Sequence, residues 1–277
     1  TTSHTSSLHT HTHTHAHATM RASAAAFTPS FAPPPPSTPP PPSTPPPTTT
    51  TTDGARAYPS DNVVSIDVEC VATGVTHNDR EVAQIAIVNA VDEKVLLNVF
   101  VRPRSSVVSY MTPLTGITRE TLEAEAVSFD DALAMVRRAL PTDAVVVGQG
   151  VLKDVQEWLK LERGVDYGDL IDLTGIWRVW NERYKSWSVF SQDHLVRCLL
   201  DDTEVNASHD AAGDCVKSVR LYRLFLKLKD DAAGLASAHA KLLATPPEPS
   251  FSKRFPSYEG VCQGNRKTCA CGAPFFS

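Results

Sequence analysis

The sequence VVSIDVECVATG runs from Val63 to Gly74. It is a β-branched, hydrophobic run typical of a strand, yet it carries Asp67 and Glu69 at its centre. Because successive side chains of a strand point to opposite faces, both carboxylates point to the same face. Two like charges on one half-buried face repel each other and cost desolvation free energy. A bound cation would remove that cost, although two exposed acids on an edge strand would not need one.

The composition limits what the chain can be. Its 277 residues, 42% of them hydrophobic, are enough for one sizeable domain with tails. The net charge of -5 argues against bulk binding of nucleic acid along a basic surface, but it leaves open an enzyme that holds a few nucleotides through metal ions. The six cysteines do not suggest a dense disulfide scaffold, so a reducing compartment is expected. No stretch reaches the length of a membrane span, and no membrane partner is expected.

Residues 1–60 are predicted to be a disordered His/Thr/Pro-rich leader. The run HTHTHTHAH at 9–17 is followed by a proline- and threonine-rich run at 32–52. Such segments have little apolar surface to bury, and proline favours extended, solvated chain. Histidine runs can bind metal. Met20 could be an internal start, and because no acid appears between it and Asp53, organelle targeting stays open as an alternative.

Residues 61–229 are predicted to form one α/β domain. Three β-branched runs separated by short polar connections indicate an antiparallel meander, after which the apolar spacing becomes helical. A meander followed by alternating helices and strands implies a mixed sheet flanked by helices. The predicted strands are 62–71, 81–90, 94–103, 143–150 and 169–177. The predicted helices are 128–140, 152–161, 191–200 and 209–228, with Ser128 and Ser191 as N-caps of the first and third and Ser208 or Asp210 as that of the fourth.

Residues 230–277 are predicted to be a separate, Ala/Pro-rich tail that contains Cys262, Cys269 and Cys271. Zinc sites usually need four ligands with cysteine pairs two to four residues apart, whereas here a fourth ligand is missing nearby and Cys-x-Cys is cramped. The tail is therefore expected to be flexible or to bind a partner. Its basic residues are Lys253, Arg254, Arg266 and Lys267.

Three more ionisable residues lie downstream of the acidic pair. Asp154 follows an apolar strand at the start of a helix, where an acid can simply complement the helix dipole. His209 and Asp214 lie five residues apart near the start of the last predicted helix, where a histidine is also common as a structural residue. In chain order these residues read D-x-E, then D, then H-x4-D.

This ordered set resembles the DEDD superfamily of 3′–5′ exonucleases, in the subclass whose fifth residue is histidine, over about residues 61–225. VVSIDVECVATG resembles the first motif, and HDAAGDCVKSVRLY, which ends at Tyr222, resembles the third. A strand that ends in proline and leads to Tyr110, Thr112, Gly116 and Ile117 resembles the RNA exonuclease 4-like branch. The second motif departs from the family, because Gln149 stands where members often have His or Asn.

The resemblance implies a ribonuclease-H-like fold, in which a three-strand antiparallel meander and parallel strands form one mixed sheet. It also implies two divalent cations, Mg²⁺ or Mn²⁺, which prefer carboxylate and water oxygens. Asp67 would bridge both cations, Glu69 and Asp214 would complete the inner shell, and Asp154 would hold the second cation partly through water. His209 would be the general base.

Substrate contacts are expected beside the first strand. Backbone groups around Cys70 and Val71 would meet the terminal 3′ hydroxyl and ribose. Tyr110, together with Met111 and Trp158, is a candidate for stacking on bases, and each is also a candidate core residue. The aromatic and basic stretch GIWRVWNERYKSWSVF, residues 175–190, either covers the substrate cleft or packs as an amphipathic helix.

The predicted function is a metal-dependent exonuclease that hydrolyses phosphodiester bonds from the 3′ end of single-stranded nucleic acid by a two-metal mechanism, with RNA as the expected substrate. Two alternatives stay open: a DNA-directed repair or proofreading exonuclease, and a binding module without catalysis. Retention of all five site residues argues against the second alternative. The resemblance implies a nuclear or cytoplasmic location inside the cell.

Overall fold

The computed structural model describes residues 62–200, 210–264 and 269–271. The predicted leader and His209 lie outside these residues. The described residues belong to one compact unit. Among them, no helix combines the length and the apolar character needed to cross a membrane.

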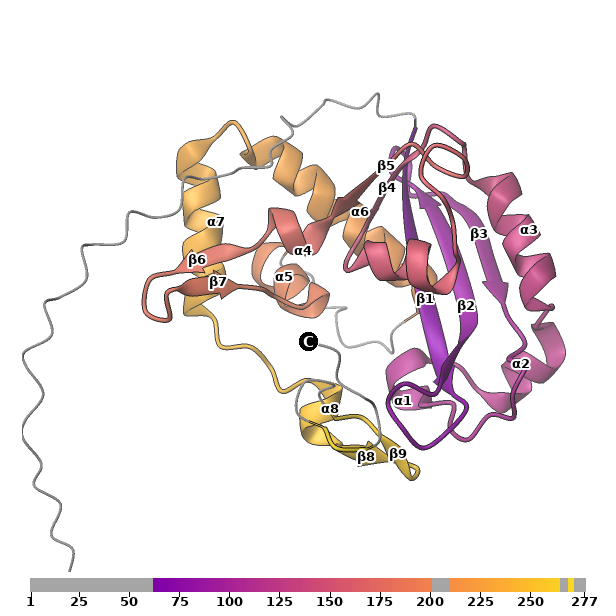
Figure 1. Ribbon diagram of the computed structural model, residues 1–277. Coiled ribbons are helices and arrows are strands. Elements are labelled where there is room, and N and C mark those ends of the chain that lie inside the picture. The colour runs from indigo at the N-terminus through magenta and orange to yellow at the C-terminus, as the bar shows by residue number, and fades with distance from the viewer. Residues whose placement is uncertain (1–61, 201–209, 265–268, 272–277) are drawn as a thin grey trace, which may run out of the picture. The chain divides into compact units, whose positions relative to one another are not determined.

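The core of this unit is a five-stranded mixed sheet with the strand order β3-β2-β1-β4-β5 (Figure 1). β1 and β2 are antiparallel, as are β2 and β3, whereas β4 runs parallel to both β1 and β5. The bounds are β1 Val63–Ala72, β2 Arg80–Asn89, β3 Val95–Phe100, β4 Val145–Gly148 and β5 Asp169–Asp172. The predicted meander and the mixed sheet are therefore confirmed.

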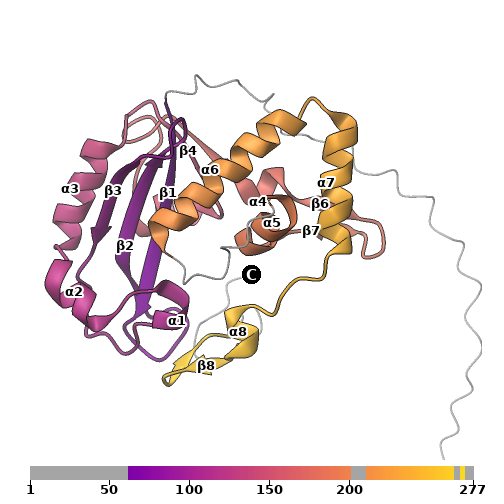
Figure 2. The ribbon, with the colours of Figure 1, turned by 180° about the vertical axis from the view of Figure 1, so that it is seen from behind.

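Helices cover both faces of the sheet and two small hairpins lie outside it. The helices are α1 Thr112–Thr115, α2 Arg119–Glu125, α3 Phe129–Ala139, the π-helical η2 Lys153–Trp158, α4 Leu173–Ile176, α5 Gln192–Leu199, α6 Ala211–Leu228, α7 Ala232–Ala244 and α8 Phe251–Arg254. The hairpins are β6 Val179–Asn181 with β7 Ser186–Ser188, and β8 Ser257–Tyr258 with β9 Val261–Cys262. α6 crosses one face of the sheet, and α3 packs on the other face (Figure 2).

Side-chain oxygens set where several helices begin. Ser128 and Ser191 accept hydrogen bonds from backbone N–H groups in the first turns of α3 and α5, as the sequence predicts. Asp210 caps α6. Asp172 caps α4, which ends the predicted strand 169–177 after four residues.

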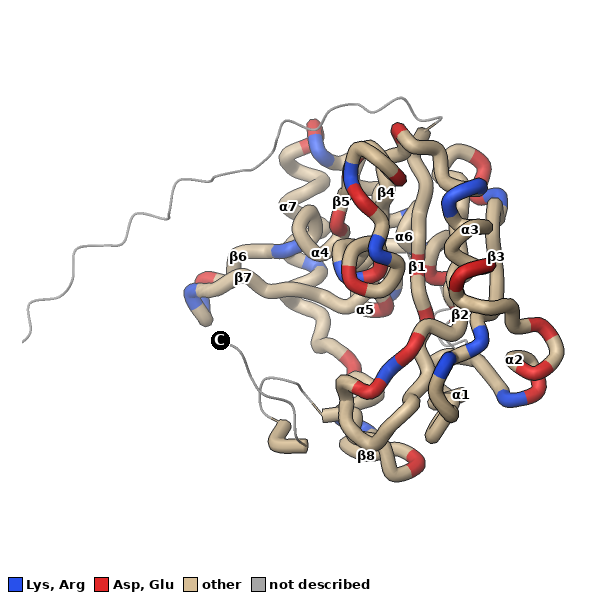
Figure 3. Tube along the Cα trace, turned by 45° about the vertical axis from the view of Figure 1, so that its right-hand side comes forward, with Lys and Arg blue, Asp and Glu red and all other residues tan. Residues whose placement is uncertain are grey.

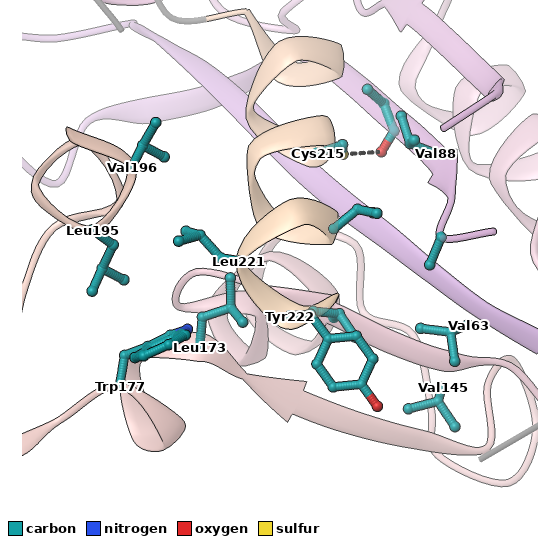
Figure 4. Packing of buried hydrophobic residues seen from close by; sticks show 14 of the residues in the cluster. Val63, Val88, Val145, Leu173, Trp177, Leu195, Val196, Cys215, Leu221 and Tyr222 are labelled. Atoms are coloured by element: carbon teal, nitrogen blue, oxygen red, sulfur yellow. Dashed lines mark hydrogen bonds between the residues drawn. The ribbon is translucent and has the colours of Figure 1, made fainter. Parts of the chain in front are cut away.

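The alternation along β1 divides the core into two layers. Val64 and Ile66 point to the face covered by α3, while Val63 points to the face covered by α6. Figure 4 shows the α6 layer, in which the Cys215 thiol donates to the backbone carbonyl of Ala86 across 3.5 Å. Asp67 and Glu69 share the face of Val63, and their carboxylates meet that of Asp214 at the start of α6.

The segment 230–277, which is predicted from sequence to be a separate tail, contains α7 and α8. Leu242 of α7 is buried in the α6 layer, and its backbone carbonyl lies 3.1 Å from Nε2 of His194 on α5. Sequence inspection missed α7 because its alanines show no clear apolar stripe, although alanine is the best helix former. Asp231 caps it by accepting from Gly234 N–H.

A buried glutamine ties the start of α6 to the sheet. Gln84 on β2 lies opposite Glu69 and is 1% exposed. Its amide nitrogen donates to Oδ1 of Asp210 across 2.8 Å and to Oδ1 of Asn98 across 2.9 Å. These bonds satisfy the buried amide and fix the N-terminus of α6 over β1.

We expect Gln84→Met to lower the free energy of unfolding by about 1–3 kcal/mol, because it removes this buried hydrogen-bond network at nearly constant volume. Asn98→Ala, a change at the exposed end of the network, should cost less than about 1 kcal/mol. Urea denaturation of both variants measures the difference. Equal losses would show that Gln84 does not hold α6 in place.

Candidate metal and nucleic-acid site

The acidic pair on β1 lies where the strand ladder changes register. Asp67 pairs with Ala86 and Glu69 with Gln84, and the register then shifts between Glu69 and Cys70. Both acids are half-buried. Such a bulge leaves backbone groups unpaired and often stands beside a functional site.

α6 brings a third carboxylate to this pair. Asp214, which is 6% exposed, lies in the first turn of α6. One carboxylate oxygen from each of Asp67, Glu69 and Asp214 lies within 4.8 Å of the other two. An all-oxygen, anionic donor set of this size fits a hard divalent cation, which also removes the repulsion between the carboxylates.

A lysine that sequence inspection missed contacts this cluster. The Lys217 ammonium lies 2.7 Å from Oδ1 of Asp214, and both side chains are largely buried. Burial acts to lower the pKa of Lys217, but the carboxylates of Asp214, Asp193 and Asp67 together outweigh burial, so the pKa lies above its ordinary value. The i, i+3 spacing from Asp214 on a predicted helix was the available signal.

Asp154 lies at the start of η2 and does not belong to the three-carboxylate cluster of the described residues. It lines the same cavity as Glu69, whose volume is about 330 Å³. Burial raises the pKa of Asp154 to about 7, and the charges of Asp172 and Glu157 act in the same direction. A carboxylate held this unfavourably without a cation is suited to a second metal position.

The remaining predicted residues divide between the cavity and the core. Cys70, Met111 and Trp158 line the cavity. Burial, followed by the charge of Glu69, raises the pKa of the Cys70 thiol, which therefore stays protonated. Val71 is fully buried, so any substrate contact there would come from its backbone.

Tyr110 packs beside Ile117 under the Arg119 guanidinium and is not among the residues that line this cavity. His209, the predicted base, lies outside the described residues.

The aromatic and basic stretch 175–190 forms a hairpin and not the amphipathic helix considered from sequence. Trp177 is buried against Phe225, whereas Trp180 and Trp187 meet edge to face across β6 and β7 with ring centres 5.6 Å apart. The Arg178 guanidinium lies 4.5 Å from the centre of the Trp187 ring. None of these residues is among those that line the 330 Å³ cavity.

Comparison with known proteins identifies the family. The exonuclease (RNase T) family matches residues 64–222, a range that contains all five predicted catalytic and metal-binding residues. The chain belongs to the exonuclease family. The predicted DEDD-type relationship with a histidine subclass is thereby confirmed.

Three comparisons place this exonuclease chain among others. Small RNA degrading nuclease 3 of Arabidopsis thaliana is 36% identical over 37% of this chain and 13% of its own length. RNA exonuclease 4 of Candida glabrata is 32% identical over 34% of each chain. The Neurospora crassa Pan2 catalytic unit has the same fold, with a TM-score of 0.54 at 19% identity over 70% of this chain and 32% of that one. The chain thus spans about a third or less of the length of each.

The raised pKa of Asp154 predicts a pH-dependent stability. Below about pH 3 this group is protonated in both folded and unfolded states and has no effect on stability. Between about pH 4 and pH 7 the group ionises in the unfolded state but stays protonated in the folded state, so the free energy of unfolding falls as the pH rises. Above about pH 7 the group is ionised in both states, and its contribution no longer changes.

Asp154→Asn should therefore stabilise the protein by about 1–3 kcal/mol at pH 8 and by almost nothing at about pH 3. Urea unfolding in buffer free of magnesium and manganese measures this. Glu125→Gln, at an exposed acid at the end of α2, is the matched control and should change stability by less than about 0.5 kcal/mol. An Asp154→Asn variant that is less stable than the parent at pH 8 would contradict the argument.

Proposed function

We propose that this chain is a divalent-metal-dependent 3′–5′ exonuclease that shortens single-stranded RNA from its 3′ end. The main support is that carboxylate oxygens of Asp67, Glu69 and Asp214 lie within 4.8 Å of one another. Glu69 lines a cavity that Asp154 lines too. Residues far apart in the sequence meet there, and hydrophobic packing alone would not place like charges together.

The chemistry follows from the donor set. Bound Mg²⁺ or Mn²⁺ ions would supply an activated water at neutral pH and would neutralise charge on the phosphorus oxygens. Asp67, Glu69 and Asp214 would hold the ions together with Asp154, which lines the same cavity as Glu69. His209 would accept the proton from the attacking water, since an ordinary imidazole pKa of about 6.5 suits that task.

The geometry favours a frayed single-stranded end. The cavity, of about 330 Å³, is in the size range of a small-ligand pocket, which supports binding of a terminal nucleotide over binding of a duplex. The register shift after Glu69 frees backbone groups that could meet the terminal ribose. Acidic and basic residues are interspersed on the side shown in Figure 3. This distribution supports binding of RNA through the metal site more than binding along a broad basic surface.

RNA is proposed as the substrate because the named relatives are RNA nucleases. Small RNA degrading nucleases 2 and 3 and RNA exonuclease 4 are among them. The Pan2 exonuclease module of Saccharomyces cerevisiae, which shares the fold, has been solved in complex with A7 RNA.

A digestion assay tests polarity, substrate and catalysis together. With Mg²⁺ or Mn²⁺, we expect single-stranded RNA labelled at its 5′ end to give a ladder of shortened products, and RNA labelled at its 3′ end to release the label at once as a mononucleotide. RNA should be degraded faster than a matched DNA in competition. Faster DNA degradation would favour a repair or proofreading enzyme, and intact RNA would indicate a binding module.

Two variants separate the assigned roles. Asp67→Ala should abolish activity because it removes the proposed bridging oxygens, while His209→Ala should slow turnover about 10²–10⁴-fold and leave metal affinity intact. Glu123→Ala, at an exposed acid on α2, is the control and should behave as the parent. Metal affinity and turnover that change equally in both variants would contradict these roles.

A further inference from the structure

The three C-terminal cysteines meet a histidine from the connection between β1 and β2. His77, Cys262, Cys269 and Cys271 each place one ligand atom within 4.8 Å of the other three. Sγ of Cys271 lies 3.1 Å from Nδ1 of His77, and the Sγ atoms of Cys262 and Cys269 are 3.2 Å apart. His77 is buried, and all three thiols are half-buried and free.

We propose that these four side chains bind one zinc ion as a structural Cys₃His site. Three sulfurs and one imidazole nitrogen are the soft donors that zinc takes in such sites, and four protein ligands fill its tetrahedron. Zn–S bonds of about 2.3 Å place tetrahedral sulfurs about 3.8 Å apart, within the span of this cluster. A disulfide would need about 2.05 Å between sulfurs, so Cys262 and Cys269 are not joined.

The donor chemistry separates this site from the carboxylate site. Asp67, Glu69 and Asp214 offer only hard oxygen atoms, which suit Mg²⁺ or Mn²⁺. The second cluster offers sulfur and nitrogen, which magnesium does not select. The chain therefore carries two metal sites of different kinds, and each can be emptied or mutated without removing a ligand of the other.

A tight turn and two backbone hydrogen bonds fix the position of Cys262. Glu259 and Gly260 both have positive φ values, 48° and 77°, which matches the tight turn of a two-residue hairpin. Cys262 N–H donates to the Val75 carbonyl across 2.9 Å, beside His77. The Arg80 guanidinium donates to the Cys262 carbonyl across 3.0 Å.

Gly264 packs against the sulfurs of Cys262 and Cys269. Its N–H donates to Sγ of Cys262 across 3.3 Å, which stabilises a thiolate ligand. A Cβ at this position would lie 3.3 Å and 3.4 Å from the sulfurs of Cys269 and Cys262. The turn thus leaves little room between its backbone and the two sulfurs.

The C-terminal segment has too small a core to hold this geometry by packing. β8 and β9 have two residues each, and in the described part of 246–271 the buried apolar side chains are Phe251 and Val261. Isolated two-stranded hairpins are marginal in water, and small units of this kind normally need a metal or disulfides. A zinc ion would supply this stabilisation and tie the segment to the β1–β2 connection, next to which it lies in both ribbon views (Figures 1 and 2).

The zinc site also shapes the active-site cavity. His77, Cys262, Gln263 and Gly264 line the 330 Å³ cavity together with Glu69. The side-chain amide of Gln263 donates to Sδ of Met111, another lining residue. Zinc would therefore hold one wall of the cavity in place; this part of the inference rests on the proposed function.

The first test is the metal content of the full chain. After expression with zinc and exhaustive dialysis, elemental analysis should find about one zinc per chain, and thiol modification should release it. Cobalt(II) should replace it and give the sulfur-to-cobalt charge-transfer absorption that the histidines of the leader cannot produce. No bound zinc, or a chain in which mass spectrometry finds a Cys262–Cys269 disulfide, would overturn the proposal.

Variants locate the site. His77→Ala and Cys271→Ser should each lose zinc and the cobalt absorption, whereas Cys198→Ala, a buried free cysteine outside the cluster, should keep both. A Cys271→Ser protein with full zinc content would contradict the assignment. Because a single variant can also misfold, zinc removal from the parent chain by a thiol reagent, followed by reduction and zinc addition, provides the second measurement.

The cavity role has a separate readout. Loss of zinc should raise the KM for RNA about tenfold and change kcat much less, because no proposed magnesium ligand is touched. Asp67→Ala should lose activity and keep zinc. A zinc-replete chain without nuclease activity would defeat the proposed function and leave the zinc site standing, whereas an unchanged KM without zinc would defeat the cavity role.

Discussion

The arrangement of this protein depends on holding like charges together. Asp67, Glu69 and Asp214 repel one another, and their convergence within 4.8 Å is maintained by structure around them. The β1 strand is fixed on both sides by β2 and β4, and the start of α6 is fixed to the sheet through Gln84 and Asp210. The Lys217 ammonium offsets part of this repulsion at Asp214, and a divalent cation bound between the three carboxylates would offset the rest.

Much of this frame could be predicted from sequence because the signals are local. The period-two pattern of β1 places both acids on one face, and Ser128 and Ser191 mark helix starts through their own hydrogen bonds. Asp154 and Asp214 could be predicted because their order along the chain matches a family pattern. That pattern implies that residues far apart in the sequence meet in the fold, which the chemistry of single residues does not.

The parts that sequence missed depend on long-range contacts or weak patterns. Lys217 is an ordinary helix lysine until Asp214 lies 2.7 Å away. His77 stands in a polar connection, and only the fold brings it to Cys271, which is why three cysteines lacked a fourth ligand in the sequence. The hairpin at 179–188 has mixed aromatic and charged residues that fit a helix or a strand equally well.

Anomalous diffraction from a crystal grown with Mn²⁺ would test whether the carboxylates form one divalent-metal site. We expect manganese peaks between Asp67, Glu69 and Asp214, with a second position towards Asp154. Manganese bound elsewhere, with these carboxylates left without a metal at saturating concentration, would contradict this expectation.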